Sequence, residues 1–254
     1  MFQEIKQNPN LSALVEIGIL FLPALPAYLW IWPNLNVGQN DLFQALVYLY
    51  ILAGTVYIGR RRWSWEALGV NRNGLWLSLA CGMVILTARL LIILGIEWSA
   101  QPASLTWLSL LGSFLFYFFM VGLVEELLFR GLLYRLLEDW GGVRWAIWGS
   151  SFGFLLWHIF GQGLIVGLAT FLIGLLFALI RWRAGGILGL IVIHALWDLE
   201  TVLLVADSNA EILGPGMFSL KNQTMIWLGT ILLVLTPIYL WKIYPVFQRR
   251  RLSG

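Results

Sequence analysis

The sequence has very little charge for its length. Only 11% of its 254 residues are Asp, Glu, Lys or Arg, whereas a soluble domain carries about 25%. So few charged side chains do not cover the surface of a water-soluble protein of this size. The scarcity of charge therefore excludes the ordinary soluble classes and indicates that most of the surface faces lipid.

Cysteine and histidine are also scarce. The single cysteine, Cys81, lies in an apolar run, so no internal disulfide framework holds the fold. Histidine occurs only at positions 158 and 194, and both positions lie within apolar runs. Ionisable side chains are costly in such surroundings, so we treat both histidines as candidate functional residues.

Apolar residues make up the rest of the pattern. They account for 60% of the chain, with fifteen Trp and eight Tyr, and aromatic residues of this kind gather at membrane interfaces. Because a spanning helix needs about 20 residues, we predict an all-α polytopic membrane protein with eight transmembrane helices in one bundle. Residues 1–254 then form a single domain. The predicted spans are Leu11–Trp32, Asp41–Gly59, Leu75–Trp98, Leu105–Leu137, Trp145–Phe160, Leu164–Ile180, Gly186–Ala206 and Gln223–Tyr244.

Basic residues occupy alternate connections between these spans. Arginines follow the second, fourth, sixth and eighth spans, whereas the intervening connections contain a single basic residue, Lys221. By the positive-inside rule this alternation predicts that both termini are cytoplasmic. The chain has a net charge of +3, and most of its basic residues lie in short breaks between apolar runs. We therefore predict the lipid bilayer, and no nucleic acid, as a partner.

Ionisable residues inside the spans are the candidate functional groups. Glu126 and Arg130 stand four residues apart, share one face of a helix, and are expected to form an ion pair. Glu125 points to another face and has no such partner on its own helix. We therefore predict that Glu126 and Arg130 support the structure, whereas Glu125 acts chemically.

Two further patterns lie on later spans. His194 and Asp198 are four residues apart, and Phe154 precedes His158 by one turn, so each pair shares a helix face. Counted at about 1.5 Å per residue, Glu125, His158 and His194 reach similar depths. Either histidine alone would more often be a packing residue. The joint pattern predicts one polar cavity with Phe154 as an aromatic wall.

This residue set is suited to hydrolysis of an amide. A carboxylate beside an imidazole activates water as a general base, and the pair of His194 and Asp198 can stabilise an oxyanion. No Gly-x-Ser-x-Gly elbow occurs, and Cys81 has no evident catalytic partner. We favour chemistry without a cofactor. A divalent metal such as zinc is the alternative, and Glu125, His158 and His194 would then be its ligands.

Three motifs resemble one known family. Glu-Glu-Leu-Leu-Phe-Arg at 125–130 matches EExxxR, Phe-Leu-Leu-Trp-His at 154–158 matches FxxxH, and His-Ala-Leu-Trp-Asp at 194–198 matches HxxxN/D. In this order, within residues 105–206, they resemble the CPBP (Abi) family of CAAX prenyl endopeptidases and bacteriocin-processing enzymes. The resemblance implies an intramembrane endopeptidase, expected in a bacterial inner membrane, that cleaves a membrane-associated peptide or protein. Its substrate is expected to be prenylated, leader-bearing or transmembrane.

The resemblance also implies roles for the individual residues. Glu125 activates water together with His158, while His194 and residue 198 hold the oxyanion. The eukaryotic members usually have Asn at the last position, where this chain has Asp198. Because an ionised Asp repels an oxyanion, Asp198 is expected to be protonated or to orient His194. This departure weakens the inference that the substrate is a prenylated protein more than it weakens the inference of peptidase chemistry.

Two other functions compete with proteolysis. The chain could be a noncatalytic membrane immunity or partner-stabilising protein, whose activity would survive the loss of Glu125 and His158 together. A proton-coupled transporter is less favoured, because the sequence shows no paired half-repeats. Two more charges need an account: Arg89, with Glu97 two turns later, is expected to form an ion pair inside the bundle or to reach the far interface, and Glu200 near a span end is expected to reach the headgroups.

Overall fold

The computed structural model describes residues 9–23, 37–96, 107–162 and 164–205, and in these ranges the chain is helical and contains no strand. The all-α class predicted from the sequence is therefore confirmed. The elements are α2 (Pro9–Phe21), α4 (Val37–Arg62), α5 (Leu75–Ile96), α6 (Trp107–Phe116), η3 (Tyr117–Gly122), α7 (Leu123–Glu125), η4 (Glu126–Leu133), α8 (Tyr134–Gly141), α9 (Val143–Gln162), α10 (Leu164–Ala184) and α11 (Leu188–Val205).

Elements α6 to α8 follow one another without a break, so the described residues form seven helical segments. These segments follow the first seven predicted spans in order. The eighth predicted span, 223–244, lies outside the described residues. The count of eight helices and the assignment of the whole chain to one domain both stay predictions.

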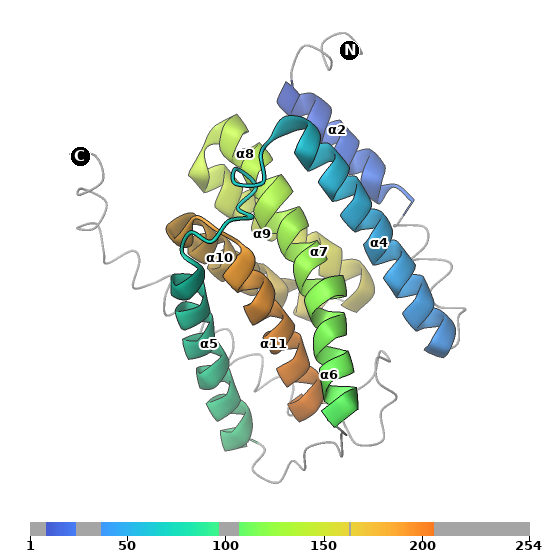
Figure 1. Ribbon diagram of the computed structural model, residues 1–254, viewed down its shortest axis with the longest axis vertical. Coiled ribbons are helices and arrows are strands. Elements are labelled where there is room, and N and C mark those ends of the chain that lie inside the picture. Colours follow the sequence, from blue (N-terminus) through green and yellow to red (C-terminus); the bar gives the residue numbers. More distant parts are fainter. Residues whose placement is uncertain (1–8, 24–36, 97–106, 163, 206–254) are drawn as a thin grey trace, which may run out of the picture.

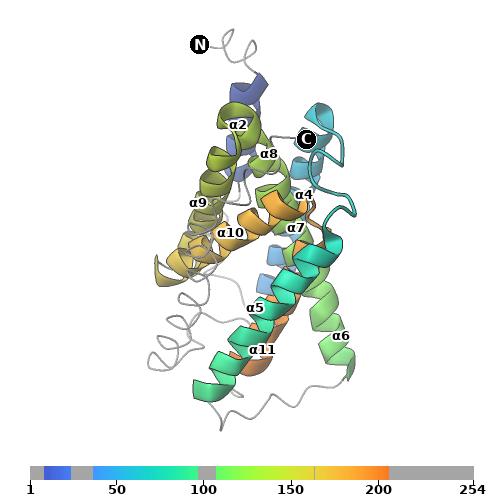
Figure 2. The same cartoon turned by 90° about the vertical axis from the view of Figure 1, so that its left-hand side faces the viewer.

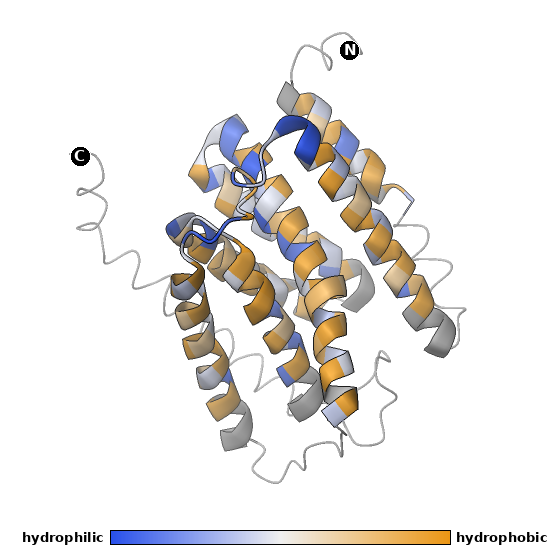
Figure 3. Ribbon diagram, viewed as in Figure 1, coloured by the Kyte–Doolittle hydropathy of each residue, from blue (hydrophilic) through white to orange (hydrophobic). Residues whose placement is uncertain are grey.

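The outer surface of the bundle is apolar. Among the most exposed side chains are Trp107 at 87%, Trp76 at 79% and Leu108 at 79%, and Figure 3 shows apolar residues along the lengths of the helices. Within the described residues, three helices are long and apolar enough to cross a membrane: Leu42–Arg62, Leu111–Gly141 and Val166–Ala184. Such a surface is unfavourable in water and favourable in lipid. The chain is an integral membrane protein.

One helix lies at the centre of the bundle. Between residues 121 and 134 only Leu123 and Leu133 are partly exposed, and every other side chain is buried. A helix that is buried all round must be surrounded by other helices. Here α4, α9 and α11 pack against it (Figure 1 and Figure 2). The EExxxR motif therefore lies on a stretch of helix that neighbouring helices enclose on nearly every side.

Two π-helical segments, η3 and η4, flank the three residues of α7. Their i→i+5 hydrogen bonds widen the helix, a feature that often marks functional sites. Beside them the backbone of α11 comes very close, because a Cβ atom on Gly122 would lie 2.7 Å from the carbonyl oxygen of Ile191. Glycine at 122 thus permits a contact that any larger residue would push apart.

Basic side chains gather at one end of the bundle. Arg60, Arg61 and Arg62 end α4, and Arg181 and Arg183 lie in the last turn of α10. The Arg181 guanidinium donates to the carbonyl oxygen of Ala67 in the loop after α4, at 3.3 Å. These ends lie at the upper side of Figure 1. The grouping agrees with a positive-inside arrangement, while the side of the membrane on which the termini lie stays a prediction.

A methyl group at position 122 should loosen the bundle. We expect Gly122→Ala to lower the free energy of unfolding in detergent by about 1–3 kcal/mol, because the new Cβ forces η3 and α11 apart. Gly112→Ala on the same helix is the matched control, since nothing lies within 4 Å of a Cβ built there. Thermal unfolding of both variants tests the expectation, and equal melting temperatures would contradict it.

Candidate active site

Glu125 lies at the end of α7 with 2% of its surface exposed. Its Oε1 atom accepts hydrogen bonds from the Tyr48 hydroxyl at 2.6 Å and from the indole N–H of Trp157 at 3.0 Å. Its Oε2 atom lies 3.6 Å from Nε2 of His194 and 4.0 Å from Nε2 of His158. Thus the acid and both imidazoles lie together, as the spacing of the motifs predicted.

The ring orientation of both histidines follows from their Nδ1 contacts. Nδ1 of His158 lies 2.9 Å from the carbonyl oxygen of Phe154, and Nδ1 of His194 lies 2.7 Å from Oε1 of Glu126. Because a carbonyl and a carboxylate accept hydrogen bonds, Nδ1 carries the proton in each ring. In the neutral tautomers both Nε2 atoms therefore present lone pairs to the Glu125 carboxylate. The two Nε2 atoms and Oε2 of Glu125 are therefore three hydrogen-bond acceptors that lie close together.

Glu126 connects two of the motifs. It is completely buried and pairs with the equally buried Arg130, whose Nη1 lies 3.0 Å from Oε1. This is the predicted i,i+4 ion pair. The same oxygen also accepts the proton of His194 Nδ1, a contact that the sequence did not predict. Glu126 thus orients an imidazole of α11 in addition to pairing within its own helix.

Aromatic rings enclose the charged groups. Between ring centroids, Phe154 lies 4.4 Å from His158 and 5.9 Å from His194. The ring centroid of Phe177 on α10 lies 5.8 Å from that of His194. The Arg130 guanidinium lies over Phe154 at 4.2 Å and over Phe177 at 5.4 Å. Phe154 is therefore the aromatic wall that the sequence predicted, and it contacts the arginine as well as the histidines.

Asp198 lies at the rim of this cluster. Its Oδ2 atom is 3.8 Å from Nε2 of His194, and 25% of its side chain is exposed, compared with 7% for His194. Of the residues predicted for the site, Asp198 is the one most accessible from outside. Its distance to Nε2 exceeds that of a hydrogen bond, so the contact is electrostatic.

A second buried charge pair lies just beyond Asp198. Nη1 of Arg89 on α5 is 3.0 Å from Oε2 of Glu200, and its guanidinium lies 4.2 Å from the Trp197 ring. The ion pair inside the bundle that was expected for Arg89 is therefore present, with Glu200 as the partner. The depth of Glu200 relative to the headgroups stays a prediction, and Glu97 lies outside the described residues.

Sequence reasoning missed two residues of the site. Trp157 lies inside the motif at 154–158, yet its type is not part of that pattern. Tyr48 lies on α4, far from every motif in sequence. The only available signal was a general one, since a buried Tyr or Trp usually finds a hydrogen-bond partner.

A metal site was the alternative that the sequence left open. In the described part of the chain, no group of three or more His, Cys, Asp or Glu side chains is placed to hold one metal ion. The Nε2 atoms of His194 and His158 lie 3.6 and 4.0 Å from Oε2 of Glu125, somewhat farther than the separation of about 3.4 Å between ligand atoms in ideal tetrahedral zinc with bonds of about 2.1 Å. The choice between metal-free and metal chemistry stays open to experiment.

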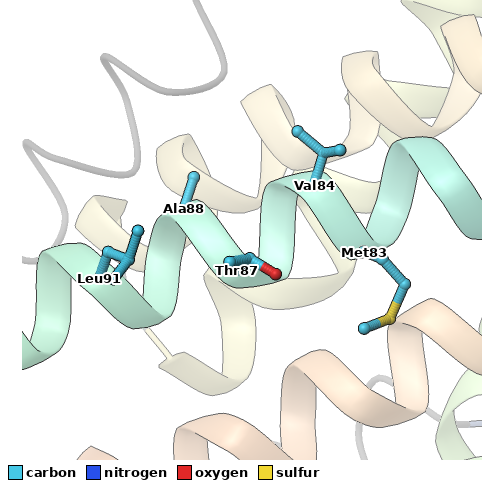
Figure 4. Close-up of a pocket in the computed structure, with 5 residues that line it drawn as sticks. All are labelled: Met83, Val84, Thr87, Ala88 and Leu91. Carbon is cyan, nitrogen blue, oxygen red and sulfur yellow. The ribbon is translucent and has the colours of Figure 1, made fainter.

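A shallow surface hollow lies elsewhere on the molecule. It is lined by Met83, Val84, Thr87, Ala88 and Leu91, all on α5 (Figure 4). None of these residues belongs to the cluster around Glu125. With Val84 and Leu91 more than half exposed, the hollow is part of the apolar outer face of α5.

Comparison with known families points to the same segment. Residues 107–199 match the family described as Type II CAAX prenyl endopeptidase Rce1-like. This range runs from the start of α6 into α11 and contains all three motifs, so the family resemblance predicted from them is confirmed. Neither the comparison with curated proteins nor that with solved structures found a match.

The buried arginine should be essential to the fold. We expect Arg130→Met to lower the free energy of unfolding by about 3–5 kcal/mol, because it leaves the Glu126 charge buried without its partner. Arg135→Met is the matched control. Arg135 pairs with Glu138 while about a third exposed, so its loss should cost less than about 1 kcal/mol. Similar losses in the two variants, measured by unfolding in detergent, would rule out a special cost at position 130.

Proposed function

We propose, on the premise that residues 107–199 are the core of a CAAX-type membrane endopeptidase, that Glu125, His158 and His194 hydrolyse a peptide bond of a membrane-associated substrate. One observation carries this proposal. Nε2 of each imidazole lies within 4.0 Å of the same Glu125 oxygen, in a buried cluster on three different helices. Such a convergence of titratable groups in a membrane interior is costly and is expected where it has a function.

In the proposed reaction Glu125 is the general base. Its Oε2 takes a proton from a water molecule while the water oxygen forms a bond to the peptide carbonyl carbon. His158 lies beside this oxygen and relays the proton to the leaving nitrogen, so that the C–N bond breaks as an amine departs. The hydrogen bond from Nδ1 of His158 to the Phe154 carbonyl keeps Nε2 directed at the reacting atoms.

The proposed oxyanion site involves His194 and Asp198. Donation from His194 to the oxyanion requires a proton on Nε2, and Glu126 fixes the ring through Nδ1. Asp198 lies on the same side of that ring, 3.8 Å from Nε2. A protonated Asp198 would donate to the oxyanion directly, whereas an ionised one would orient the Nε2 proton. Either arrangement places a preorganised hydrogen-bond donor where negative charge develops in the transition state.

The substrate is proposed from the site's setting. The cluster lies among apolar helices, so the scissile bond must belong to a peptide that is itself held at the membrane. Prenylated, leader-bearing and transmembrane peptides all meet this condition. From the family resemblance we propose a bacterial inner membrane, and from the basic residues at one end of the bundle we propose that both termini are cytoplasmic. Proteomic comparison of membranes that carry wild type or Glu125→Ala would identify the substrate through shifted termini.

Loss of the base should abolish turnover. We expect Glu125→Gln to lower kcat about 100- to 10,000-fold, because an amide of nearly the same shape accepts no proton. Glu66→Gln is the control, since Glu66 is an exposed acid in the loop after α4. Cleavage of a panel of prenylated, leader-bearing and transmembrane peptides by purified protein is the measurement. Full activity of Glu125→Gln would sink the assignment of the base.

Chelation separates the two chemistries that the sequence left open. We expect cleavage to persist after dialysis against EDTA and 1,10-phenanthroline, because the proposed steps use only side-chain protons. Loss of activity on chelation and recovery with Zn²⁺ would instead make Glu125, His158 and His194 metal ligands. Activity before and after metal restoration, with metal content measured in parallel, decides the outcome.

A further inference from the structure

We infer that Tyr48 is a positioning residue for Glu125, so that the working site includes α4, a helix outside the family-matched residues 107–199. This inference rests on the proposed function. It assigns Tyr48 the task of fixing the position and the plane of the carboxylate, so that one oxygen faces the two imidazoles. Without such a constraint, the carboxylate would tilt or shift away from the reacting atoms.

The two oxygens of Glu125 have different surroundings. Tyr48 and Trp157 both donate to Oε1, at 2.6 and 3.0 Å, and two donors occupy the two lone pairs of that oxygen. The Tyr48 contact has the short length typical of an O–H donor on a carboxylate. Oε2 accepts no hydrogen bond from the described residues and faces His158 and His194. One oxygen is therefore held in place, and the other is left for the reaction.

Tyr48 is itself held firmly. It is buried in the core cluster that contains Val124, Leu128 and Phe129 of the central helix. Its ring meets the Trp157 ring edge-on, with centroids 6.0 Å apart. Because α4 packs against both α7 and η4, the hydroxyl reaches Oε1 of Glu125, whereas the imidazoles lie beside Oε2. The residue therefore acts through Glu125 rather than on a bound peptide.

The position of the base determines the rate. A catalytic group displaced by about 1 Å can cost about 100-fold in rate. Loss of the Tyr48 hydroxyl would leave Oε1 with the Trp157 donor alone, so the carboxylate would be held less firmly. Since the hydroxyl acts through Glu125, the loss should appear in kcat and not in KM.

A conservative substitution tests this role. We expect Tyr48→Phe, which keeps the ring and removes the hydroxyl, to lower kcat about 10- to 100-fold with KM changed less than about twofold. Tyr50→Phe is the matched control, because Tyr50 lies on the same helix with 45% of its surface exposed. Equal kcat values for the two variants would overturn the positioning role, and so would a change confined to KM.

A second measurement needs no substrate. Tyr48→Phe and Glu125→Leu are combined in a double-mutant cycle of thermal unfolding. We expect Tyr48→Phe to lower the melting temperature in the wild-type background and to have little effect in the Glu125→Leu background, where the acceptor is gone. Equal shifts in both backgrounds would refute the Tyr48–Glu125 contact.

Failure of the inference can be told apart from failure of the proposed function. If Glu125→Gln is inactive while Tyr48→Phe matches wild type, the base stands and the inference falls. If no peptide is cleaved by the wild type, or if Glu125→Gln is fully active, the proposed function falls and takes the positioning role with it. The unfolding cycle then still reports whether the contact exists.

Discussion

The buried carboxylate of Glu126 is the contact on which the arrangement of the site depends. One oxygen receives the Arg130 guanidinium from the same helix and the Nδ1 proton of His194 from α11. The charges of Glu126 and Arg130 would be prohibitive in this interior if either stood alone, so each requires the other. Because the carboxylate is fixed by its own helix, it can in turn fix an imidazole on another. An ion pair that serves the fold thereby places a group that serves the chemistry.

The neighbouring acids achieve different environments through different helices. Glu126 contacts Arg130 and Nδ1 of His194. Glu125 contacts Tyr48 of α4 and Trp157 of α9 and lies beside Nε2 of the same histidine. Adjacent residues on a helix diverge by about 100°, and a helix buried all round has neighbours in every direction. The central position of η3, α7 and η4 is therefore what allows two consecutive glutamates to take two tasks. A helix at the edge of the bundle would have exposed one of them to lipid.

Periodicity was sufficient to predict the parts of the site that repeat along one helix. The Glu126–Arg130 pair, the edge-on contact of Phe154 with His158 and the common face of His194 and Asp198 all follow from a spacing of four residues. Contacts between distant helices were harder. Depth counting placed Glu125, His158 and His194 at one level, but it could not reveal Tyr48, because no motif distinguishes one buried tyrosine from another. The partner of Arg89 was hard to identify for the same reason, because Glu200 lies on a different helix. The π-helical segments were also not predicted, since no local sequence pattern indicates a change from α- to π-helical hydrogen bonding.

The close contact at Gly122 sets the distance between two helices of the site without relying on side-chain packing. Gly122 precedes Glu125 by about one turn, and Ile191, whose carbonyl oxygen it approaches, precedes His194 by about one turn. A contact near the main chains of the two helices thus fixes the separation of the acid and the imidazole. Main-chain atoms have no rotamers to exchange, so this contact is stiffer than one between two side chains. Variation in the lipid-facing residues of either helix can accumulate without altering the spacing of the two groups.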